Sequence, residues 1–175
     1  LLKKNPPKTV FASEIIRKAI AMREIRLEIH EIAISAPVLA GDEQDFTIHA
    51  PPNLIIGALC NLIDNSIYWN EVQKERNNEN KKSGIKISCI PSESGKSGTI
   101  YVSDTGTGFT IDIDKATQPF YGSRPEGMGL GLFFSSLVME QNGGALSLLS
   151  IEDARDELFL PEAYCGATVA LRFKE

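Results

Sequence analysis

Two asparagines four residues apart, Asn61 and Asn65 in the segment NLIDNSIYW, are the residues whose types and spacing point most directly to chemistry. Side chains at positions i and i+4 share one face of a helix, so both amides can face the same ligand. An amide oxygen is a hard, neutral ligand that suits Mg²⁺, an ion that keeps several waters and is bound partly through substrate phosphates. Alone, such a pair is also typical of an ordinary polar helix surface, so its meaning depends on the rest of the chain.

A first glycine-containing segment, DTGTGF, follows further along the chain. Asp104 stands at the end of an expected strand, and Gly106 and Gly108 let backbone approach a flat ligand closely. A buried carboxylate at this place can accept a hydrogen bond from an exocyclic amine such as that of adenine. The alternative for this segment is a plain Asp-Gly turn.

A second glycine-containing segment, GMGLGL at residues 127–132, opens an expected helix. Glycine-rich backbone at a helix N-terminus offers free N–H groups and a favourable dipole to an anion. The segment is not a phosphate loop of the Gly-Lys-Ser/Thr type, because that sequence does not follow. It also matches the dinucleotide-binding fold poorly, since repeated βαβ units are absent. The three segments together predict a site for a metal ion and a nucleotide.

The helix that presents the asparagines is expected from about Asn53 to Trp69, after two prolines that suit a first turn. At 100° per residue, one side of this helix is polar and the other apolar. The polar side carries Gly57, Asn61, Asp64, Asn65 and Tyr68, and the apolar side carries Ile55, Ile56, Leu59, Leu62, Ile63 and Ile67.

The remaining elements favour an α+β fold. An earlier helix is expected from Ser13, its N-cap, to about Leu27, and alternation indicates strands at 27–34 and 46–48. Segment 70–84 is polar and is expected to be a connection. Strands are expected at 85–89, 99–103, 145–151 and 167–173, with a helix after Gly131 that stops at Asn142. Because hairpins predominate late in the chain, we expect a two-layer sandwich with a mixed, mainly antiparallel sheet.

Composition limits the classes of partner. The chain of 175 residues is long enough for one domain with its own core, and its start without Met leads us to expect a fragment of a longer protein. The net charge is −5 without a basic stripe, so no nucleic acid is expected. No apolar run approaches the roughly 20 residues of a membrane span. Three widely spaced cysteines fit neither a disulfide framework nor a zinc site. We therefore expect a cytoplasmic fragment without membrane contact.

The ordered set NLIDNS, DTGTGF and QPFYGSRPEGMGLGLFFSSLVMEQNGG resembles the GHKL ATP-binding superfamily, which includes gyrase, the heat-shock chaperone ATPase, the MutL mismatch-repair ATPase and histidine kinases. The likeness is strongest to the catalytic ATP-binding domain of sensor histidine kinases and covers nearly the whole chain, residues 1–175. It implies the Bergerat fold, in which helices cover one face of a mixed sheet. ATP then lies between the helices and a flexible lid, here about residues 109–126.

The resemblance also implies roles for individual residues. Asn65 should coordinate Mg²⁺ with help from Asn61, and Arg124 stands where lysine is common and should reach the terminal phosphate. Asp104 should bind the adenine amine. The residues implied to contact the nucleotide are Asp104, Gly106, Gly108, Phe109, Gly127, Met128, Gly129, Leu130, Gly131 and Thr168.

Three departures from the family pattern stand out. Tyr68 replaces a lysine that histidine kinases often carry, so a phosphate-binding charge is missing from the helix or is supplied by Arg124. Met128 stands where threonine is common, which is tolerable if backbone binds the phosphates. The acidic stretch 151–164 is longer than usual and is interpreted as a surface insertion, with a partner-binding role left open.

Position 61 distinguishes the reactions that such a site can perform. Hydrolases of the gyrase type carry a glutamate there as general base, and Asn61 cannot accept a proton. A neutral imidazole attacks through its own lone pair, so the sequence favours phosphoryl transfer to a histidine over fast hydrolysis. Asp64 is an alternative base, although a supporting role is favoured. Serine kinases of the anti-sigma type are less favoured, because they carry a carboxylate at this position.

The acceptor histidine is expected on a separate domain upstream, with a response regulator as a further partner. His30 is a poor candidate acceptor, because the proline that follows it is wrongly spaced and because it lies in an expected strand. The alternative is a GHKL ATP-dependent switch or ATPase without histidine phosphotransfer.

Overall fold

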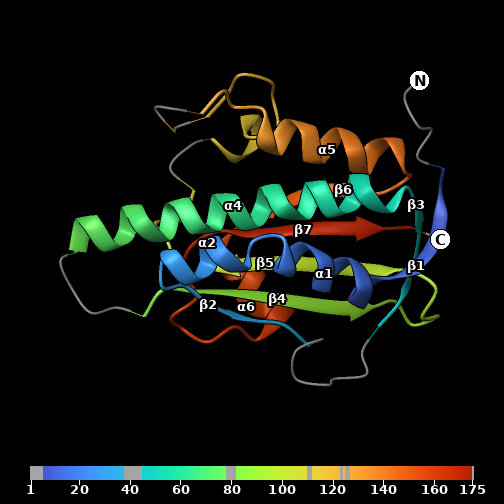
Figure 1. Ribbon diagram of the computed structural model, residues 1–175, viewed down its shortest axis with the longest axis horizontal. Coiled ribbons are helices and arrows are strands. Elements are labelled where there is room, and N and C mark those ends of the chain that lie inside the picture. Colours follow the sequence, from blue (N-terminus) through green and yellow to red (C-terminus); the bar gives the residue numbers. More distant parts are fainter. Residues whose placement is uncertain are drawn as a thin grey trace.

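A mixed five-stranded sheet forms the centre of the computed structural model, which describes residues 6–37, 45–77, 82–109, 112–122, 124 and 127–174 (Figure 1). The strand order is β2-β4-β5-β7-β6. Only the β2–β4 pair is parallel within this sheet, and the other three pairs are antiparallel. The bounds are β2 Ala33–Ser35, β4 Gly84–Pro91, β5 Gly98–Asp104, β6 Ala145–Leu149 and β7 Thr168–Phe173. A separate antiparallel ribbon pairs β1 (Lys8–Phe11) with β3 (Thr47–Ala50).

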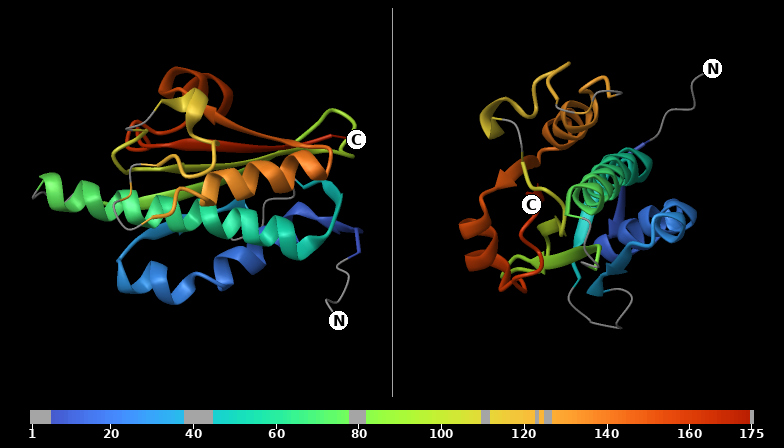
Figure 2. Two further views of the ribbon diagram at one scale, coloured as in Figure 1. Left: turned by 90° about the horizontal axis from the view of Figure 1, so that it is seen from above. Right: turned by 90° about the vertical axis from the view of Figure 1, so that its left-hand side faces the viewer.

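Among the described residues, four helices cover one face of the sheet, with α4 and α5 running side by side (Figures 1 and 2). They are α1 Ala12–Ala21, α2 Glu24–Ile29, α4 Pro52–Asn77 and α5 Gly131–Gln141. A short 3-10 turn, η1, spans Ile113–Lys115. This arrangement confirms the predicted α+β sandwich with a mainly antiparallel sheet. Within the described ranges, no helix combines the length and the apolar character that crossing a bilayer requires.

The apolar side of α4 supplies much of the core between the helices and the sheet. All six apolar residues predicted for this side are buried, and four of them, Ile55, Leu59, Ile63 and Ile67, are fully inaccessible. They pack with residues of α1 and with the inner face of β4, β5 and β7. The polar side of α4 is therefore turned away from the core, as the 3.6-residue period predicts.

The predicted strand at 27–34 is largely wrong, because residues 24–29 form α2 and only 33–35 form a strand. The alternation that indicated a strand includes Leu27 and Ile29, which are a buried and a 70% exposed position of one helix, α2. Ser13 is also not an N-cap: α1 begins after Phe11. The carboxylate of Asp45 instead accepts a hydrogen bond from the Ser13 N–H at 3.1 Å.

The predicted connection at 70–84 is wrong for its first half, because α4 continues to Asn77. Residues 70–77 of α4 lack an apolar stripe, and polar contacts hold them in place instead. The buried Asn70 amide donates to the carbonyl oxygens of Ser66 at 2.8 Å and Gly84 at 3.4 Å. Lys74 donates to the His30 carbonyl oxygen at 2.5 Å. Residues 78–81 lie outside the described part of the chain.

The acidic stretch predicted to be a surface insertion contains a helix, α6 (Ile151–Leu158), which lies on the opposite face of the sheet (Figure 2). Its start is capped by Ser150, whose hydroxyl accepts a hydrogen bond from the Asp153 N–H at 3.1 Å. Ala154 and Leu160 pack with Tyr101 and other residues of that face in a second small core. The segment is therefore partly structural.

Candidate functional site

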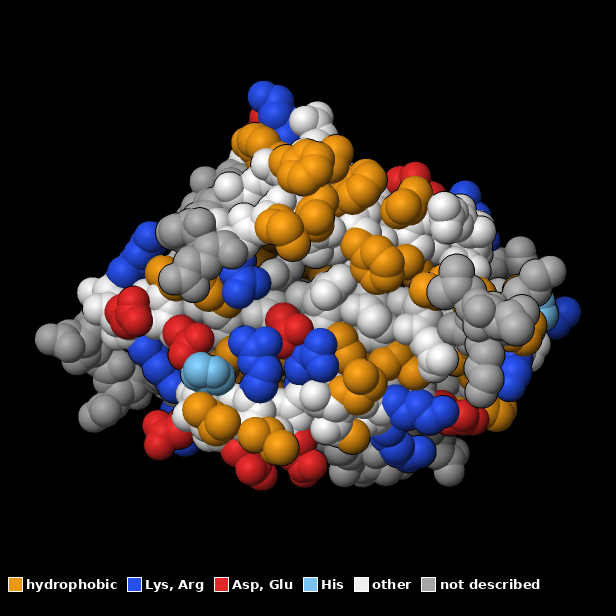
Figure 3. Space-filling model, turned by 45° about the horizontal axis from the view of Figure 1, so that its top comes forward, with side chains coloured by type: hydrophobic (Ala, Val, Ile, Leu, Met, Phe, Trp, Pro, Cys, Tyr) orange, Lys and Arg blue, Asp and Glu red, His pale blue; other side chains and the backbone are white. Residues whose placement is uncertain are grey.

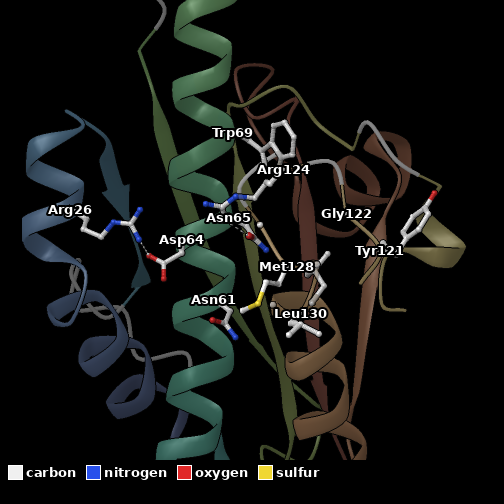
Figure 4. Close-up of a pocket in the computed structure, with 15 residues that line it drawn as sticks. Arg26, Asn61, Asp64, Asn65, Trp69, Tyr121, Gly122, Arg124, Met128 and Leu130 are labelled. Atoms are coloured by element: carbon white, nitrogen blue, oxygen red, sulfur yellow. Dashed lines mark hydrogen bonds and ion pairs between the residues drawn. The ribbon is translucent and has the colours of Figure 1, made fainter. Parts of the chain in front are cut away.

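A cavity of about 320 Å³ lies between the middle of α4 and the start of α5 (Figure 4). Asn61 and Asn65 line it from α4, and residues 127–132 line it from the opposite side. The close-up shows Met128 and Leu130 between the two helices, facing the asparagines. The fold thus brings together the asparagine pair and the glycine segment that the sequence predicted to share a site.

A smaller cavity adjoins the first, because Asn65, Trp69 and Leu132 line both. Asp104 lies in this smaller cavity, together with Gly108. The remaining lining is mainly apolar and consists of Leu62, Ser66, Val102, Phe109, Ala167 and Val169. A narrow apolar space with one carboxylate has the character of a pocket for a flat heterocycle that carries a hydrogen-bond donor.

The Asp104 carboxylate is 2% exposed and has three hydrogen-bond donors within the protein. One oxygen accepts from the N–H groups of Gly106 and Ala167, each at 3.0 Å, and the other accepts from the Ser66 hydroxyl at 2.9 Å. Burial nevertheless raises the pKa of Asp104 to about 6, because desolvation outweighs these donors. A carboxylate has about four acceptor sites, so one more donor from a ligand would stabilise its ionised form.

Two residues at this carboxylate were missed by sequence reasoning. Ser66 was not singled out, although it ends the segment NLIDNS and lines the smaller cavity. Gly166 lies so close that a Cβ atom added to it would meet an Asp104 carboxylate oxygen at 2.1 Å and the Gly106 nitrogen at 2.7 Å. Only glycine lets the segment before β7 pass the end of β5 at this distance.

Arg124 reaches the predicted metal ligand from the segment before α5. Its Nη1 donates to Asn65 Oδ1 at 3.2 Å (Figure 4). Its Cζ lies 4.2 Å from the centroid of the Tyr68 ring. Among the residues that the structure describes, no carboxylate forms an ion pair with Arg124. The cavity wall therefore carries a guanidinium group whose charge is not neutralised by a described neighbour.

Asp64 turns toward α2, away from the asparagine pair (Figure 4). One of its carboxylate oxygens accepts from Arg23 Nε at 2.9 Å and from Arg26 Nη1 at 2.5 Å. These ion pairs join α4 to α2 and favour a supporting role for Asp64 over that of a base. Arg26, which also lines the larger cavity, was not singled out from the sequence, because no local pattern connects α2 with this site.

The glycine segment forms the wall opposite α4. Gly129 has a φ of +65°, and a Cβ atom there would meet the Phe120 backbone at 2.8 Å, so glycine is required. Leu130 precedes the first residue of α5, Gly131, whose surroundings are open. Met128 lines the cavity with a largely exposed side chain. Backbone N–H groups at this helix start can therefore reach an anion in the cavity.

Two further predicted residues have different positions. Thr168 is buried, donates to the Ser103 hydroxyl at 3.0 Å and lies outside the linings of both cavities. In the predicted lid at 109–126, Phe109 lines the small cavity, whereas Tyr121 and Gly122 line the large one. Residues 110–111, 123 and 125–126 of the lid lie outside the described residues.

A family model described as histidine kinase-, DNA gyrase B- and HSP90-like ATPase matches residues 50–175 of the sequence, which include both cavities' glycines and asparagines. The chain belongs to this family. The predicted membership in the GHKL superfamily is thereby confirmed, and with it the use of ATP by domains of this kind.

The chain is similar in sequence to a sensor histidine kinase and to a sensor protein. The chain is 34% identical over 117 residues to the sensor histidine kinase ZraS of Escherichia coli O157:H7, which corresponds to 65% of this chain and 23% of ZraS. It is 26% identical over 142 residues to the sensor protein TdiS of Thauera aromatica, covering 77% of this chain and 23% of TdiS. The chain therefore spans about a quarter of the length of these relatives.

Solved structures show the same fold. The catalytic domain of the histidine kinase ThkA matches with a TM-score of 0.69 at 19% identity, covering 95% of this chain and 94% of that domain. Full-length ShkA in complex with AMPPNP matches with a TM-score of 0.68 at 19% identity, covering 95% of this chain and 30% of ShkA. The GHKL family fold thus extends over nearly the entire chain.

Proposed function

We propose that residues 1–175 are the ATP-binding catalytic domain of a sensor histidine kinase, which transfers the γ-phosphoryl group of ATP to a histidine on a separate domain. The observation that carries this proposal is the continuity of the two cavities. They place the buried carboxylate of Asp104, the oxygen of Asn65 and the glycine-rich start of α5 along one path. An adenine nucleotide presents an amine, a bound cation and a chain of phosphates, which correspond to these three features in turn.

ATP fits the described residues at both ends. The adenine amine would donate to Asp104 at the floor of the small cavity, and the apolar lining would enclose the ring. The phosphates would lie in the larger cavity, where residues 127–132 and the N-terminus of α5 offer N–H groups. Thr168 stays a predicted water-mediated contact of the adenine.

Magnesium would be held by Asn65, with Asn61 assisting, and by the phosphates themselves. This donor set fits Mg²⁺, which binds through few protein oxygens when substrate phosphates are present. No group of three or more His, Cys, Asp or Glu side chains suited to a metal occurs among the described residues. When bound, the ion would neutralise charge that develops on the phosphate oxygens during transfer.

The residues of the site support transfer to histidine rather than to water. Asn61 stands where a hydrolase has its general base. The alternative base, Asp64, is engaged in ion pairs with two arginines. An imidazole nitrogen needs no base to attack the γ-phosphorus, and the bond from that phosphorus to the bridging oxygen then breaks to release ADP. The work of the domain is therefore positioning and charge stabilisation, with Arg124 directed at the terminal phosphate.

The partners follow from this reaction. The acceptor histidine would reside on a domain of the same chain or its dimer partner, and a response regulator would receive the phosphoryl group. Apolar side chains gather beside the cavity, over α5 and the segment before it (Figure 3), and would suit contact with the acceptor domain. They include Phe120, Met128, Phe134 and Leu137. We place the domain in the cytoplasm, where ATP is available.

The test is phosphorylation of the full-length protein with labelled ATP and Mg²⁺. We expect label that is lost in acid and retained in base, which is the stability of phosphohistidine. At a limiting ATP concentration, Asp104→Asn should weaken labelling, whereas Asp156→Asn, an exposed change on α6, should leave it intact. Nucleotide binding without base-stable label would instead favour an ATP-dependent switch.

A further inference from the structure

The guanidinium of Arg124 is held by two residues that stand three positions apart on α4. The Tyr68 ring lies under it, with 4.2 Å between Cζ and the ring centroid, and Asn65 Oδ1 accepts from its Nη1 at 3.2 Å. Tyr68 is itself supported by Trp69, whose ring meets it edge-on at 4.9 Å between centroids and 82° between planes. Tyr68 thus offers a fixed aromatic face to Arg124.

A guanidinium stacked on a ring keeps its N–H donors available, whereas a guanidinium in an ion pair uses some of them. A cation within about 6 Å of a ring centroid is attracted by the negative face of the ring, yet no N–H donor of the guanidinium is used by that contact. Arg124 gives one donor to Asn65, and an arginine has five. The remaining donors lie in the guanidinium plane, where they can bind phosphate oxygens in a bidentate manner.

We propose that Tyr68 is a positioning residue, which holds the Arg124 guanidinium beside Asn65 so that it meets the terminal phosphate of ATP. This inference rests on the role proposed above for Arg124. A lysine at position 68 would supply a charge from the helix but would repel Arg124. Tyrosine supplies no charge, and its ring instead binds the Arg124 guanidinium from the segment that precedes α5. Recognition of the third phosphate is thereby made dependent on the arrangement of that segment.

The experiment compares affinities for AMPPNP and ADP, each with Mg²⁺, by calorimetry on the full chain. The variants are Tyr68→Leu, Tyr68→Phe, Arg124→Ala and the double variant Tyr68→Leu/Arg124→Ala. Loss of a stacked guanidinium should reduce AMPPNP affinity by roughly 3- to 10-fold in Tyr68→Leu while ADP affinity changes little. Tyr68→Phe keeps the ring and should keep the affinity. The double variant should bind as Arg124→Ala does, because the ring then has nothing to position.

Arg172→Ala is the matched control, because Arg172 lies over the ring of Tyr101 with 5.9 Å to its centroid and lines neither cavity. It should leave both affinities unchanged, and thermal unfolding should show that every variant folds. The inference would be overturned if Tyr68→Leu lowered AMPPNP affinity equally in the parent and in Arg124→Ala. It would also be overturned if Tyr68→Leu lowered ADP affinity as much as AMPPNP affinity.

Failure of the underlying role has a different signature. If Arg124→Ala leaves the ratio of AMPPNP to ADP affinity unchanged, Arg124 does not reach the terminal phosphate, and the positioning role of Tyr68 falls with it. If the two residues are coupled but no phosphohistidine forms, the inference stands and histidine phosphotransfer alone is refuted.

Discussion

Asp104→Asn should raise the stability of the protein at neutral pH while it lowers the affinity for adenine nucleotide. Asparagine has nearly the shape of aspartate, and its oxygen can accept the N–H groups of Gly106 and Ala167 as the carboxylate does. Its amide nitrogen can donate to Ser66, whose hydroxyl then acts as acceptor. The change therefore preserves the three hydrogen bonds and removes only the buried charge.

The size of the stability effect follows from the pKa of Asp104, which burial raises from 3.8 to about 6. The folded state binds this proton more tightly than the unfolded state. The contribution of Asp104 to stability is therefore greatest below pH 4 and is lost as the pH rises through 6. At about 1.4 kcal/mol per pH unit, the ionised carboxylate costs about 3 kcal/mol in the folded protein. Asparagine avoids this cost, so the gain at pH 7.5 should approach that value and should shrink toward zero near pH 4.

Nucleotide binding should change in the opposite direction. In the variant, the amide nitrogen that faces Ser66 also replaces an acceptor oxygen of the pocket. A donor of the protein then meets the donor amine of adenine, which should cost roughly 1–3 kcal/mol of binding free energy, or about 5- to 150-fold in affinity. When a residue binds ligand at the expense of stability, its replacement is expected to raise stability and lower ligand affinity.

Urea denaturation at pH 4.5 and 7.5, followed by the fluorescence of Trp69, measures the first effect, since Trp69 is the only tryptophan of the sequence. Titration calorimetry with ADP measures the second. The reasoning is refuted if the variant is less stable than the parent at pH 7.5, or if ADP binds both proteins equally. Asp156→Asn should change neither quantity.

Four further outcomes are expected. Asn65→Ala should remove the dependence of ATP binding on Mg²⁺, so equal strengthening by magnesium in variant and parent would contradict the metal role. Gly166→Ala should lower the free energy of unfolding by roughly 1–3 kcal/mol, because the added Cβ atom would overlap Asp104. Gly57→Ala should raise the free energy of unfolding by about 0.5–1 kcal/mol, because its added Cβ atom would meet only Phe134, at 3.8 Å. Both are measured by denaturation. ATP hydrolysis by the chain alone should stay below about 1 s⁻¹, since Asn61 cannot act as a base, and a phosphate-release assay with faster turnover would contradict that argument.

The parts of the site that the sequence predicted are those that local periodicity determines. Helical spacing alone places Asn61 and Asn65 on the polar side of α4, and the burial of Ile55 and Ile63 on the opposite side confirms it. Asp104 could be located because a strand leads to it and glycines follow. The fold class followed from the order of helices and hairpins, which is also a local property.

The missed features depend on contacts between distant segments. Gly166 matters because β7 begins beside the end of β5, and Arg26 matters because α2 packs against α4, so neither leaves a pattern in its own segment. The C-terminal extension of α4 is held by polar contacts of Asn70 and Lys74 rather than by an apolar stripe. Helix α6 could have been found, because Ser150 and Asp153 have the spacing of an N-terminal capping pair.

In the proposed ATP site, helix α4 would contribute Ser66 behind the adenine floor, Asn61 and Asn65 at the cation, and Tyr68 beneath the Arg124 guanidinium. A helix is a stiff rod with about 1.5 Å between successive residues, so the distances among these groups cannot be adjusted one at a time. Inserting one residue between Asn65 and Ser66 would rotate everything beyond it by about 100° and separate the cation ligands from the adenine floor. Variation in nucleotide handling should therefore accumulate in the segments facing α4, while the length of the helix between its asparagines and Tyr68 stays fixed.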